Sequence, residues 1–218
     1  MKYGILIVLL ALGFSGCHKK RARTVPPPTP APAARPGDVE TGVASWYGHP
    51  YHGRPAANGE IYDMEQLTAA HRTLPFNTWV RVVNLNNSKA VEVRIIDRGP
   101  FVDGRVIDLS HAAAMAVDLV GPGTAPVRLE ILRVPEAVPT GSYGVQVGSY
   151  RDRQNAERVR QSMESRYGSA RIILRQGNPV MWRVVVGSET TESGAAALSD
   201  RIRQESGERN AFVVRLDS

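Results

Sequence analysis

"RIIDRGPFVDGRVIDLSHAAA", residues 94–114, brings two aspartates to equivalent places eleven residues apart. Asp97 follows the pair Ile-Ile, and Asp108 follows the pair Val-Ile. Short β-branched runs of this kind are typical of buried strands, so we expect each carboxylate at the end of a strand. Ser110, two residues after Asp108, is a typical N-cap and predicts a helix over 110–120.

The residues on either side of this stretch also indicate strands. Short runs rich in Val, Ile and aromatic residues cover 42–47, 78–85, 90–97 and 127–134. The sequence NNS at 86–88 predicts a hairpin turn between two of these runs. A second short helix is expected over LTAAH, residues 67–71. Many strands with few helices predict a compact barrel.

The C-terminal part of the chain repeats itself. Residues 145–159 superpose on residues 184–198, and apolar residues at helical spacing match one another: Ala156, Val159 and Met163 with Ala195, Leu198 and Ile202. A strand-like run follows each helix, at 170–175 and at 211–215. Two β-α-β units in succession predict a separate α/β domain with a four-stranded antiparallel sheet and both helices on one face.

The N-terminus has the features of a secretory signal. Lys2 precedes an apolar run at 5–14 that is too short to span a bilayer. The only cysteine, Cys17, follows Ser-Gly, and this stretch resembles a lipobox, which implies a lipid-modified Cys17 and an anchored lipoprotein. His18 stands where aspartate would favour inner-membrane retention, so an outer-membrane anchor is implied. A proline-rich tether follows.

The charge distribution argues against nucleic acid as a partner. Residues 1–37 carry six Lys or Arg and no acid, whereas residues 38–138 carry nine basic and twelve acidic residues. Residues 139–218 carry twelve basic and nine acidic residues. A nucleic-acid-binding domain is expected to be strongly basic. The cluster HKKRAR beside Cys17 instead suits anionic lipid head groups.

Residues 42–134 resemble the barrel of the rare lipoprotein A family. The matching stretches occur in family order: ASWYG, HGR, ANGE, LTAAH, TLPF, DRGPF, GR-IDLS and GTAPVRLE. The resemblance implies a six-stranded double-psi β-barrel, similar to expansins and to the barrel of membrane-bound lytic transglycosylases. It also implies cleavage of peptidoglycan glycan strands without water at the β-1,4 bond after N-acetylmuramic acid, leaving a 1,6-anhydro end. No cofactor is implied.

Taken singly, the candidate catalytic residues have structural explanations. Glu60 could be a solvated turn residue, His71 a buried histidine bonded to backbone, and Asp97 a partner of Arg98 or Arg105. The family pattern instead places Glu60, His71 and Asp97 together in the site. It implies Asp97 as general acid and base, Glu60 as its partner carboxylate, and His71 as the residue that orients or shuttles the proton. Asp108 matches the catalytic aspartate of related barrels and is the rival acid and base.

Trp46, Tyr47 and Arg98 are further candidates for sugar contacts. Two departures from the family pattern weaken the enzymatic interpretation: Ala56 replaces the usual Thr before ANGE, and Ile96 replaces the usual Asn before DRGP. Each loses a polar group beside a proposed carboxylate. A non-catalytic, glycan-binding structural lipoprotein is therefore the alternative, and a hydrolase is a third hypothesis. His49 and His52 form a weak metal pattern, so no metal site is expected.

The C-terminal repeat resembles a SPOR domain over about 142–217. SPOR domains bind glycan strands stripped of their stem peptides, which accumulate at the division septum. The family's contacts fall on Gln146, Ser149, Trp182 and Arg183, although Trp182 could simply pack against a helix. Septal division proteins are further candidate partners. The expected segments are a signal peptide (1–16), lipidated tether (17–40), catalytic barrel (41–135), linker (136–141) and SPOR domain (142–218).

Overall fold

The computed structural model of the chain describes residues 34–135 and 141–217. The signal peptide, the lipidation site at Cys17 and most of the tether and linker lie outside the described residues. The described strands and helices belong to one compact unit. None of the helices in these two ranges has the length and hydrophobicity that a membrane span requires.

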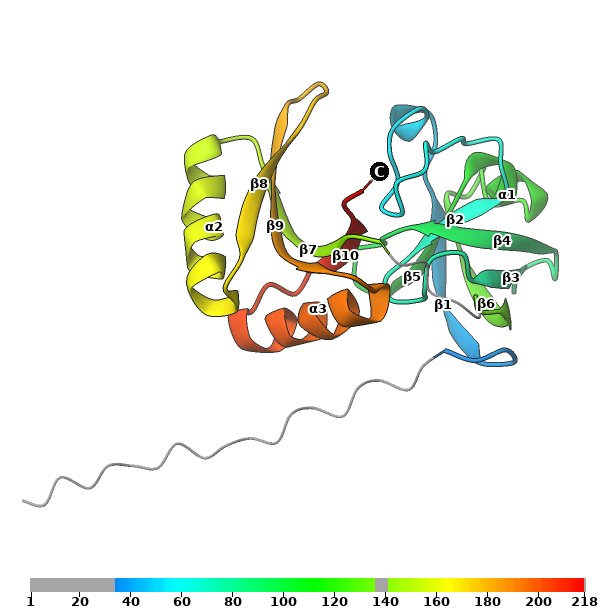
Figure 1. The fold of residues 1–218 in the computed structure, drawn as a ribbon. Helices are drawn as coiled ribbons and strands as arrows, with labels where there is room; N and C mark the ends of the chain where they lie inside the picture. The colour runs from blue at the N-terminus through cyan, green and yellow to red at the C-terminus, as the bar shows by residue number, and fades with distance from the viewer. Residues whose placement is uncertain (1–33, 136–140, 218) are drawn as a thin grey trace, which may run out of the picture. The chain divides into compact units, whose positions relative to one another are not determined.

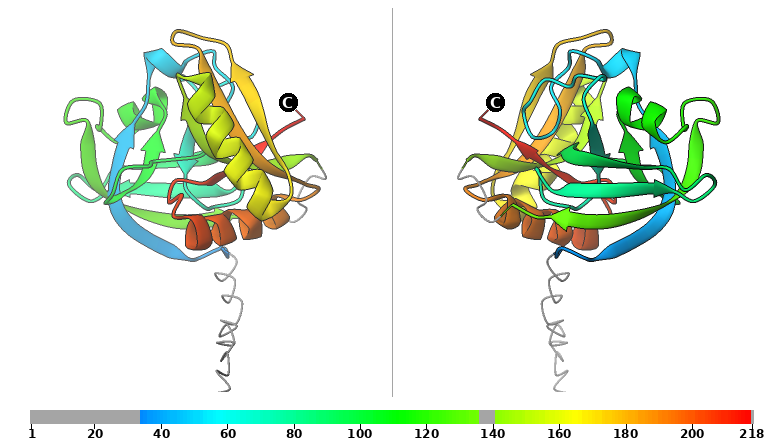
Figure 2. Two further views of the ribbon diagram at one scale, coloured as in Figure 1. Left: turned by 90° about the vertical axis from the view of Figure 1, so that its left-hand side faces the viewer. Right: turned by 90° about the vertical axis from the view of Figure 1, so that its right-hand side faces the viewer.

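The first six strands close into a barrel with the order β1-β5-β2-β4-β3-β6 (Figures 1 and 2). Strand β1 is parallel to β5 and β2 is parallel to β4, while the other neighbours are antiparallel. The strands are β1 (Val39–Trp46), β2 (Thr68–His71), β3 (Trp79–Asn84), β4 (Ala90–Asp97), β5 (Arg105–Leu109) and β6 (Thr124–Arg133). The predicted six-stranded double-psi barrel is confirmed.

Alternation of apolar and polar residues defines the inner and outer faces of the barrel. Val80 and Val82 of β3 are fully buried in the core. Arg81 lies between them on the outer face and forms an ion pair of 2.9 Å with its register partner on β4, Glu92. Side chains alternate between the two faces of a strand, so residues two apart lie on the same face, the apolar ones inside the barrel and the polar ones outside.

The short helix after β5 begins as predicted. Ser110 is the N-cap of α1 (His111–Ala116), and its hydroxyl accepts a hydrogen bond from the N–H of Ala113. The helix ends earlier than the predicted residue 120, and Asp118 then takes a left-handed conformation with φ of 55°. The predicted turn at 86–88 is confirmed, since it joins β3 to β4.

The prediction of a second helix over 67–71 is wrong. Thr68–His71 forms strand β2, in which all four residues are buried. This strand pairs with β4 on one side and with β5 on the other. Five residues are too few to form a stable helix without help from packing, so pairing on both edges overrides the helix propensity of the two alanines.

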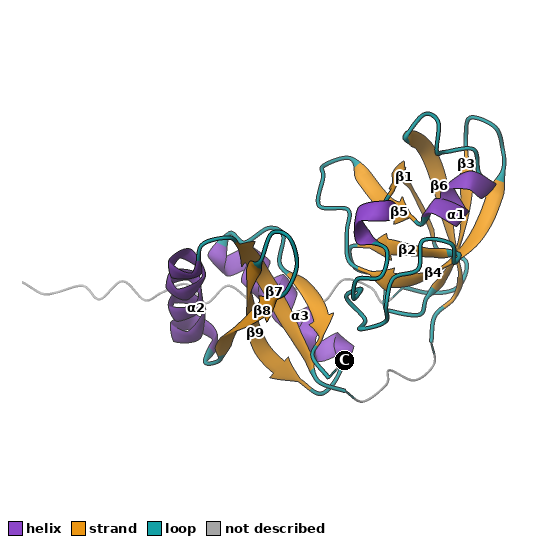
Figure 3. Ribbon diagram, turned by 90° about the horizontal axis from the view of Figure 1, so that it is seen from above, coloured by secondary structure: helices purple, strands orange, loops and turns teal. Residues whose placement is uncertain are grey.

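The C-terminal part, called here the sheet domain, has the predicted β-α-β-β-α-β order. Its elements are β7 (Tyr143–Tyr150), α2 (Arg153–Tyr167), β8 (Ala170–Arg175), β9 (Met181–Glu189), α3 (Glu192–Ser206) and β10 (Phe212–Arg215). The antiparallel strand order is β10-β7-β9-β8. Apolar residues of both helices join one core with alternate valines of β7 and β9, so both helices cover one face (Figures 1 and 3).

Candidate active site

Asp97 is a half-buried aspartate at the end of β4. Its Oδ1 atom accepts hydrogen bonds from the backbone N–H of Ala57 at 2.9 Å and of Arg98 at 2.8 Å. Burial raises the pKa of Asp97, and the two backbone hydrogen bonds oppose this effect. The carboxyl therefore holds its proton to a higher pH than an exposed aspartate does, which suits a general acid.

Asp108 lies on the other side of strand β2 from Asp97. Ala70 of β2 is the register partner of both aspartates, of Asp97 across the parallel pair and of Asp108 across the antiparallel pair. Because one strand separates them, their backbones are about 10 Å apart. The loop after Asp97 passes close by, since a side-chain carbon at Gly99 would lie 3.6 Å from Asp108 Oδ2. The barrel therefore brings the two aspartates to the same region, although Asp108 lies within β5 and not after its end.

Asp108 has its own polar partners. The hydroxyl of Ser45 on β1 donates a hydrogen bond to its Oδ1 atom. Arg105 in turn donates to the Ser45 oxygen at 2.8 Å. Burial raises the pKa of Asp108, and the Ser45 hydrogen bond opposes that effect. Both aspartates are therefore carboxyls with raised pKa values.

Tyr47 lies within electrostatic range of both aspartates. Burial raises the pKa of its hydroxyl well above the ordinary value, and the charge of Asp97 adds to this effect. The ring stacks on Tyr62 with centroids 4.4 Å apart. Neither the Tyr47 hydroxyl nor that of Thr68, both buried, makes a hydrogen bond of normal geometry among the described residues. Tyr47 thus keeps a protonated hydroxyl beside the two carboxyls.

Glu60 is part of an ion pair at the surface and makes no hydrogen bond with Asp97 in the part of the chain that the structure describes. Arg94 donates to both of its carboxylate oxygens at 2.7 Å. The Arg94 hydrogen bond holds the pKa of Glu60 below its usual range. Glu60 lines a cavity of about 300 Å³ together with Asn58 and Phe76. Its loop reaches Asp97, because Ala57 in that loop donates to the Asp97 carboxylate.

His71 is held by backbone and by an acid that the sequence did not single out. Its Nδ1 atom accepts hydrogen bonds from the N–H groups of Thr73 and Leu74, at 3.2 and 3.0 Å. Two donors at Nδ1 leave the proton of the neutral ring on Nε2, which lies 3.0 Å from Glu40 Oε2. The structure therefore directs the imidazole toward Glu40 on β1, and His71 reaches the Asp97 loop through its carbonyl oxygen, which accepts from Arg98 at 3.4 Å.

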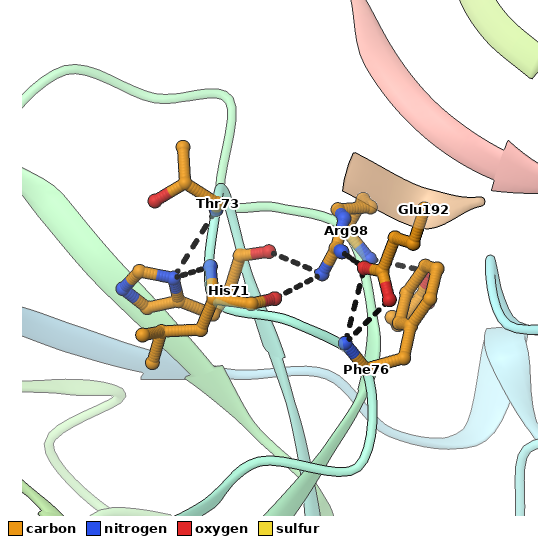
Figure 4. A network of polar contacts seen from close by, with 7 residues as sticks. His71, Thr73, Phe76, Arg98 and Glu192 are labelled. Carbon is orange, nitrogen blue, oxygen red and sulfur yellow. Dashed lines mark hydrogen bonds and ion pairs between the residues drawn. The ribbon is translucent and has the colours of Figure 1, made fainter. Parts of the chain in front are cut away.

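Arg98 is buried, and its guanidinium pairs with Glu192 of helix α3 (Figure 4). It also donates to the carbonyl oxygen of Leu74 at 2.9 Å and lies over the ring of Phe76 at 3.7 Å. Burial lowers the pKa of Arg98 to about 10, and the charge of Glu192 opposes this effect. The guanidinium is thus fully engaged by Glu192, Leu74 and Phe76.

The remaining predicted sugar contacts lie in different surroundings. Trp46 is half-buried against the barrel core, with its ring 5.6 Å from that of His111. Trp182 packs against the helix-side core of the sheet domain, and Arg153 of α2 lies over its ring at 5.1 Å. Such packing corresponds to the structural explanation for Trp182 that the sequence left open.

Gln146, Ser149 and Arg183 form a second group on the sheet domain. Arg183 donates a hydrogen bond to the side-chain oxygen of Gln146. Gln146 and Ser149 line a cavity of about 430 Å³ with Phe101 and Phe212. Amide, hydroxyl and aromatic groups in one cavity are suited to a neutral sugar.

No three His, Cys, Asp or Glu side chains gather in a way that could hold a metal ion, within residues 34–135 and 141–217. His49 begins the 3-10 helix η1 (His49–Tyr51). His52 follows it and accepts a hydrogen bond from the N–H of Met64 at 3.2 Å. His49 and His52 therefore belong to a hydrogen-bonded turn.

The sequence did not reveal which residues contact the predicted site residues. Arg94 had a usable signal, because a charged residue inside the apolar run before Asp97 needs a counter-ion. Ser45 lies inside the motif ASWYG, where a serine inside an apolar run indicates a polar partner in the fold. Glu40 and Glu192 left no signal, since each contacts a residue far away in the chain.

The comparisons with known proteins agree with this architecture. A family model described as lytic transglycolase matches residues 39–129, and a SPOR domain model matches residues 139–215. A solved expansin from Clavibacter michiganensis is 17% identical with a TM-score of 0.37, covering 71% of this chain and 81% of that one.

Two curated relatives share the name endolytic peptidoglycan transglycosylase RlpA. The one from Campylobacter jejuni is 55% identical over 96 residues, which cover 44% of this chain and 35% of the relative. The one from Helicobacter pylori strain J99 is 40% identical over 170 residues, which cover 78% of this chain and 51% of the relative. The chain thus spans from about a third to half of the length of these relatives. With a lytic-transglycolase barrel and a SPOR domain in the same order as predicted, the chain belongs to the rare lipoprotein A (RlpA) family.

Proposed function

We propose that this protein is a lytic transglycosylase that cleaves peptidoglycan glycan strands free of stem peptides. The observation that carries the proposal is the half-buried Asp97, whose carboxyl has a raised pKa and two backbone hydrogen bonds. The names of the curated relatives support the same reaction class. The bond cleaved is the β-1,4 bond between N-acetylmuramic acid and N-acetylglucosamine.

In the proposed reaction one carboxyl serves as both acid and base. The protonated Asp97 gives its proton to the glycosidic oxygen as the bond from C1 of the muramic acid to that oxygen breaks. The C6 hydroxyl of the same sugar then forms a bond to C1, and the Asp97 carboxylate takes the hydroxyl proton. The carboxyl regains its starting state, no water is consumed, and the product carries a 1,6-anhydro end. A glycosidase that uses water needs a second carboxylate for the other half of the reaction.

The other candidate residues have supporting roles in this proposal. Glu60 remains ionised in its contact with Arg94 and helps to hold the loop in which Ala57 donates to the Asp97 carboxylate. His71, fixed by Glu40, orients the segment that follows β2. Asp108 is the rival acid and base, because it is also half-buried and its carboxyl also has a raised pKa.

Substrate contacts complete the proposed site. Tyr47, which lies within electrostatic range of both aspartates, and Trp46 are the candidate sugar contacts in the barrel. The predicted contact from Arg98 does not fit the structure, because its guanidinium is buried and engaged by Glu192 and Leu74. On the sheet domain the candidates are Gln146, Ser149, Trp182 and Arg183. Binding there to stripped strands would bring the barrel to peptide-poor wall at the division septum, with an outer-membrane lipid anchor at Cys17 holding the chain in the periplasm.

A second candidate function is a structural protein that binds glycan strands without cutting them. One observation favours it: Asp97 and Asp108 line neither of the two cavities described above, and Glu60 is paired with Arg94. The departures Ala56 and Ile96 point the same way, because they make the surroundings of Asp97 more apolar.

The experiment is a comparison of three aspartate variants on amidase-treated sacculi, with soluble anhydro-oligosaccharides measured by chromatography. Asp103→Asn is the matched control, since this exposed aspartate lies in the same loop. We expect Asp97→Asn to lose activity by about 100- to 10,000-fold and Asp103→Asn to keep it. Full activity of Asp97→Asn together with loss in Asp108→Asn would reverse the assignment of the acid. Binding by the wild type with no product would establish the structural role instead.

A further inference from the structure

We propose that Glu192, on helix α3 of the sheet domain, is a positioning residue for the Asp97 carboxyl of the barrel. The inference rests on the proposed function, because it concerns how the proposed acid is held. Glu192 does not touch the reacting groups. It acts through Arg98, the residue that follows Asp97 in the chain.

Glu192 is buried and fully engaged. Its carboxylate pairs with the guanidinium of Arg98 and accepts the backbone N–H of Phe76, at 3.1 Å to Oε1 and 3.3 Å to Oε2. The side chain of Arg98 is only 2% exposed and that of Glu192 only 10%. In Figure 4 the two side chains point toward each other, with Phe76 beside them. Such a charge-assisted contact, shielded from water, fixes the direction of both side chains.

The same network fixes the segment that ends β2. Arg98 donates to the carbonyl oxygens of Leu74 and His71, at 2.9 and 3.4 Å. The guanidinium therefore connects the loop after β4 to the loop after β2, and Glu192 supplies the charge that keeps it there. Without that charge the hydrogen-bond partners of the buried guanidinium would all be neutral carbonyl oxygens, which is costly.

Asp97 is held by two backbone donors, and the sheet domain supports both. One donor is the N–H of Arg98, whose side chain Glu192 holds. The other is the N–H of Ala57, whose carbonyl oxygen accepts the N–H of Arg215 on β10 at 2.9 Å. The two contacts come from different elements of the sheet domain and converge on the two residues that bind one carboxylate oxygen. A third contact joins the same regions, because the ring of Phe101 lies 4.8 Å from that of Phe212.

Stability alone is a weak explanation for this ion pair. Taking two charges out of water costs about as much as their attraction returns, and apolar residues of similar size often serve equally well. A charged pair adds a fixed direction, which an apolar pair does not. The sheet domain is therefore more than a glycan-binding module, since it completes the support of the acid.

The test compares full-length Glu192→Gln with Glu205→Gln. The first change removes the charge that faces Arg98 but keeps an oxygen for the N–H of Phe76. The second removes an exposed charge from the same helix and serves as control. Pelleting with amidase-treated sacculi measures binding, and the initial rate at saturating sacculi measures turnover. We expect turnover of Glu192→Gln to fall on the order of 10- to 100-fold with binding unchanged, and Glu205→Gln to match the wild type.

Amide hydrogen exchange gives a readout that does not need activity. In Glu192→Gln the amides of Ala57 and Arg98 should exchange at least about 10-fold faster than in Glu205→Gln, because the donors to Asp97 are less firmly held. A wild type without product would refute the proposed function, while this exchange difference would still support the positioning role.

A double variant separates positioning from stability. Arg98→Met with Glu192→Leu replaces the charged pair by an apolar one. We expect it to unfold in urea no earlier than Glu192→Gln and to keep the low turnover. Restored turnover in the double variant would overturn the inference, as would wild-type turnover in Glu192→Gln. Faster turnover in Glu192→Gln would also overturn it, since the contact would then restrain the enzyme.

Discussion

Substitution of Ile96 tests whether the two departures from the family pattern, Ala56 and Ile96, are linked through their packing. Ile96 and Ala56 belong to one apolar cluster with Tyr62, and Tyr47 packs against it. Ile96 is 2% exposed and Ala56 is 8% exposed. The backbone of Asn58 also donates to the Ile96 carbonyl oxygen at 3.1 Å, so the loop runs along the end of β4. Ile96→Asn places the amide typical of the family into this apolar cluster.

The expected cost has two parts. Removing a fully buried isoleucine loses about 1.5–3 kcal/mol of transfer free energy. Burying an amide without a partner adds about 1–3 kcal/mol. Together, Ile96→Asn should lower the free energy of unfolding by about 2.5–6 kcal/mol, which is a large part of the 5–15 kcal/mol typical of a domain. Ile61→Asn is the control, because Ile61 is 62% exposed and should change stability by less than about 0.5 kcal/mol.

The assay is urea unfolding followed by tryptophan fluorescence, on Ile96→Asn, on Ala56→Thr and on the double variant. The hydroxyl introduced by Ala56→Thr gives the new amide a partner, so the double variant should recover at least about 1 kcal/mol relative to the sum of the single changes. A cost of Ile96→Asn below about 1 kcal/mol would refute the packing argument. Strict additivity in the double variant would show that the two departures are independent.

Three further predictions concern single side chains. Asp97→Asn should raise the free energy of unfolding at neutral pH. A carboxyl with a raised pKa destabilises the folded protein as the pH rises from the ordinary pKa of 3.8 through the pKa of the folded state, and asparagine removes this effect. Urea unfolding should therefore show a gain above that pH window and no gain below it. Glu60→Gln should lower the free energy of unfolding by less than about 1 kcal/mol at neutral pH, since the ionised form of Glu60 makes the Arg94 contact. This difference should vanish as the pH falls through the lowered pKa of Glu60, and an equally large destabilisation in acid would contradict the prediction. Ser110→Ala should cost about 1–3 kcal/mol in urea unfolding, because the helix loses its cap and the carbonyl of Gln66 loses a donor at 2.6 Å, whereas exposed Ser165→Ala should be neutral.

Local sequence patterns predicted most of the fold, because the spacing of apolar residues in each strand or helix reflects which of its faces is buried. Alternation in 90–97 marks a half-buried strand, and the repeat of apolar residues at helical spacing marks α2 and α3. The prediction failed at 67–71, where the same residues suit a helix or a buried strand and only pairing decides between them. A short apolar run without periodicity does not distinguish the two.

The site was less predictable than the fold, since a motif gives a residue but not its partner. Asp97 and Asp108 meet across Ala70 because β2 lies between their strands, an order that no local pattern contains. Glu60 and His71 were expected to share a site with Asp97, yet Glu60 pairs with Arg94 and His71 with Glu40. Their catalytic roles remain proposals.

The most direct measurement of the central claim is mass spectrometry of the products formed from amidase-treated glycan strands in heavy-oxygen water. If Asp97 drives attack by the sugar's own C6 hydroxyl, the wild type should release fragments that lack one water at the muramic acid end and contain no heavy oxygen. Asp97→Asn should release none. Heavy oxygen in newly formed reducing ends, or unchanged release by Asp97→Asn, would contradict the account.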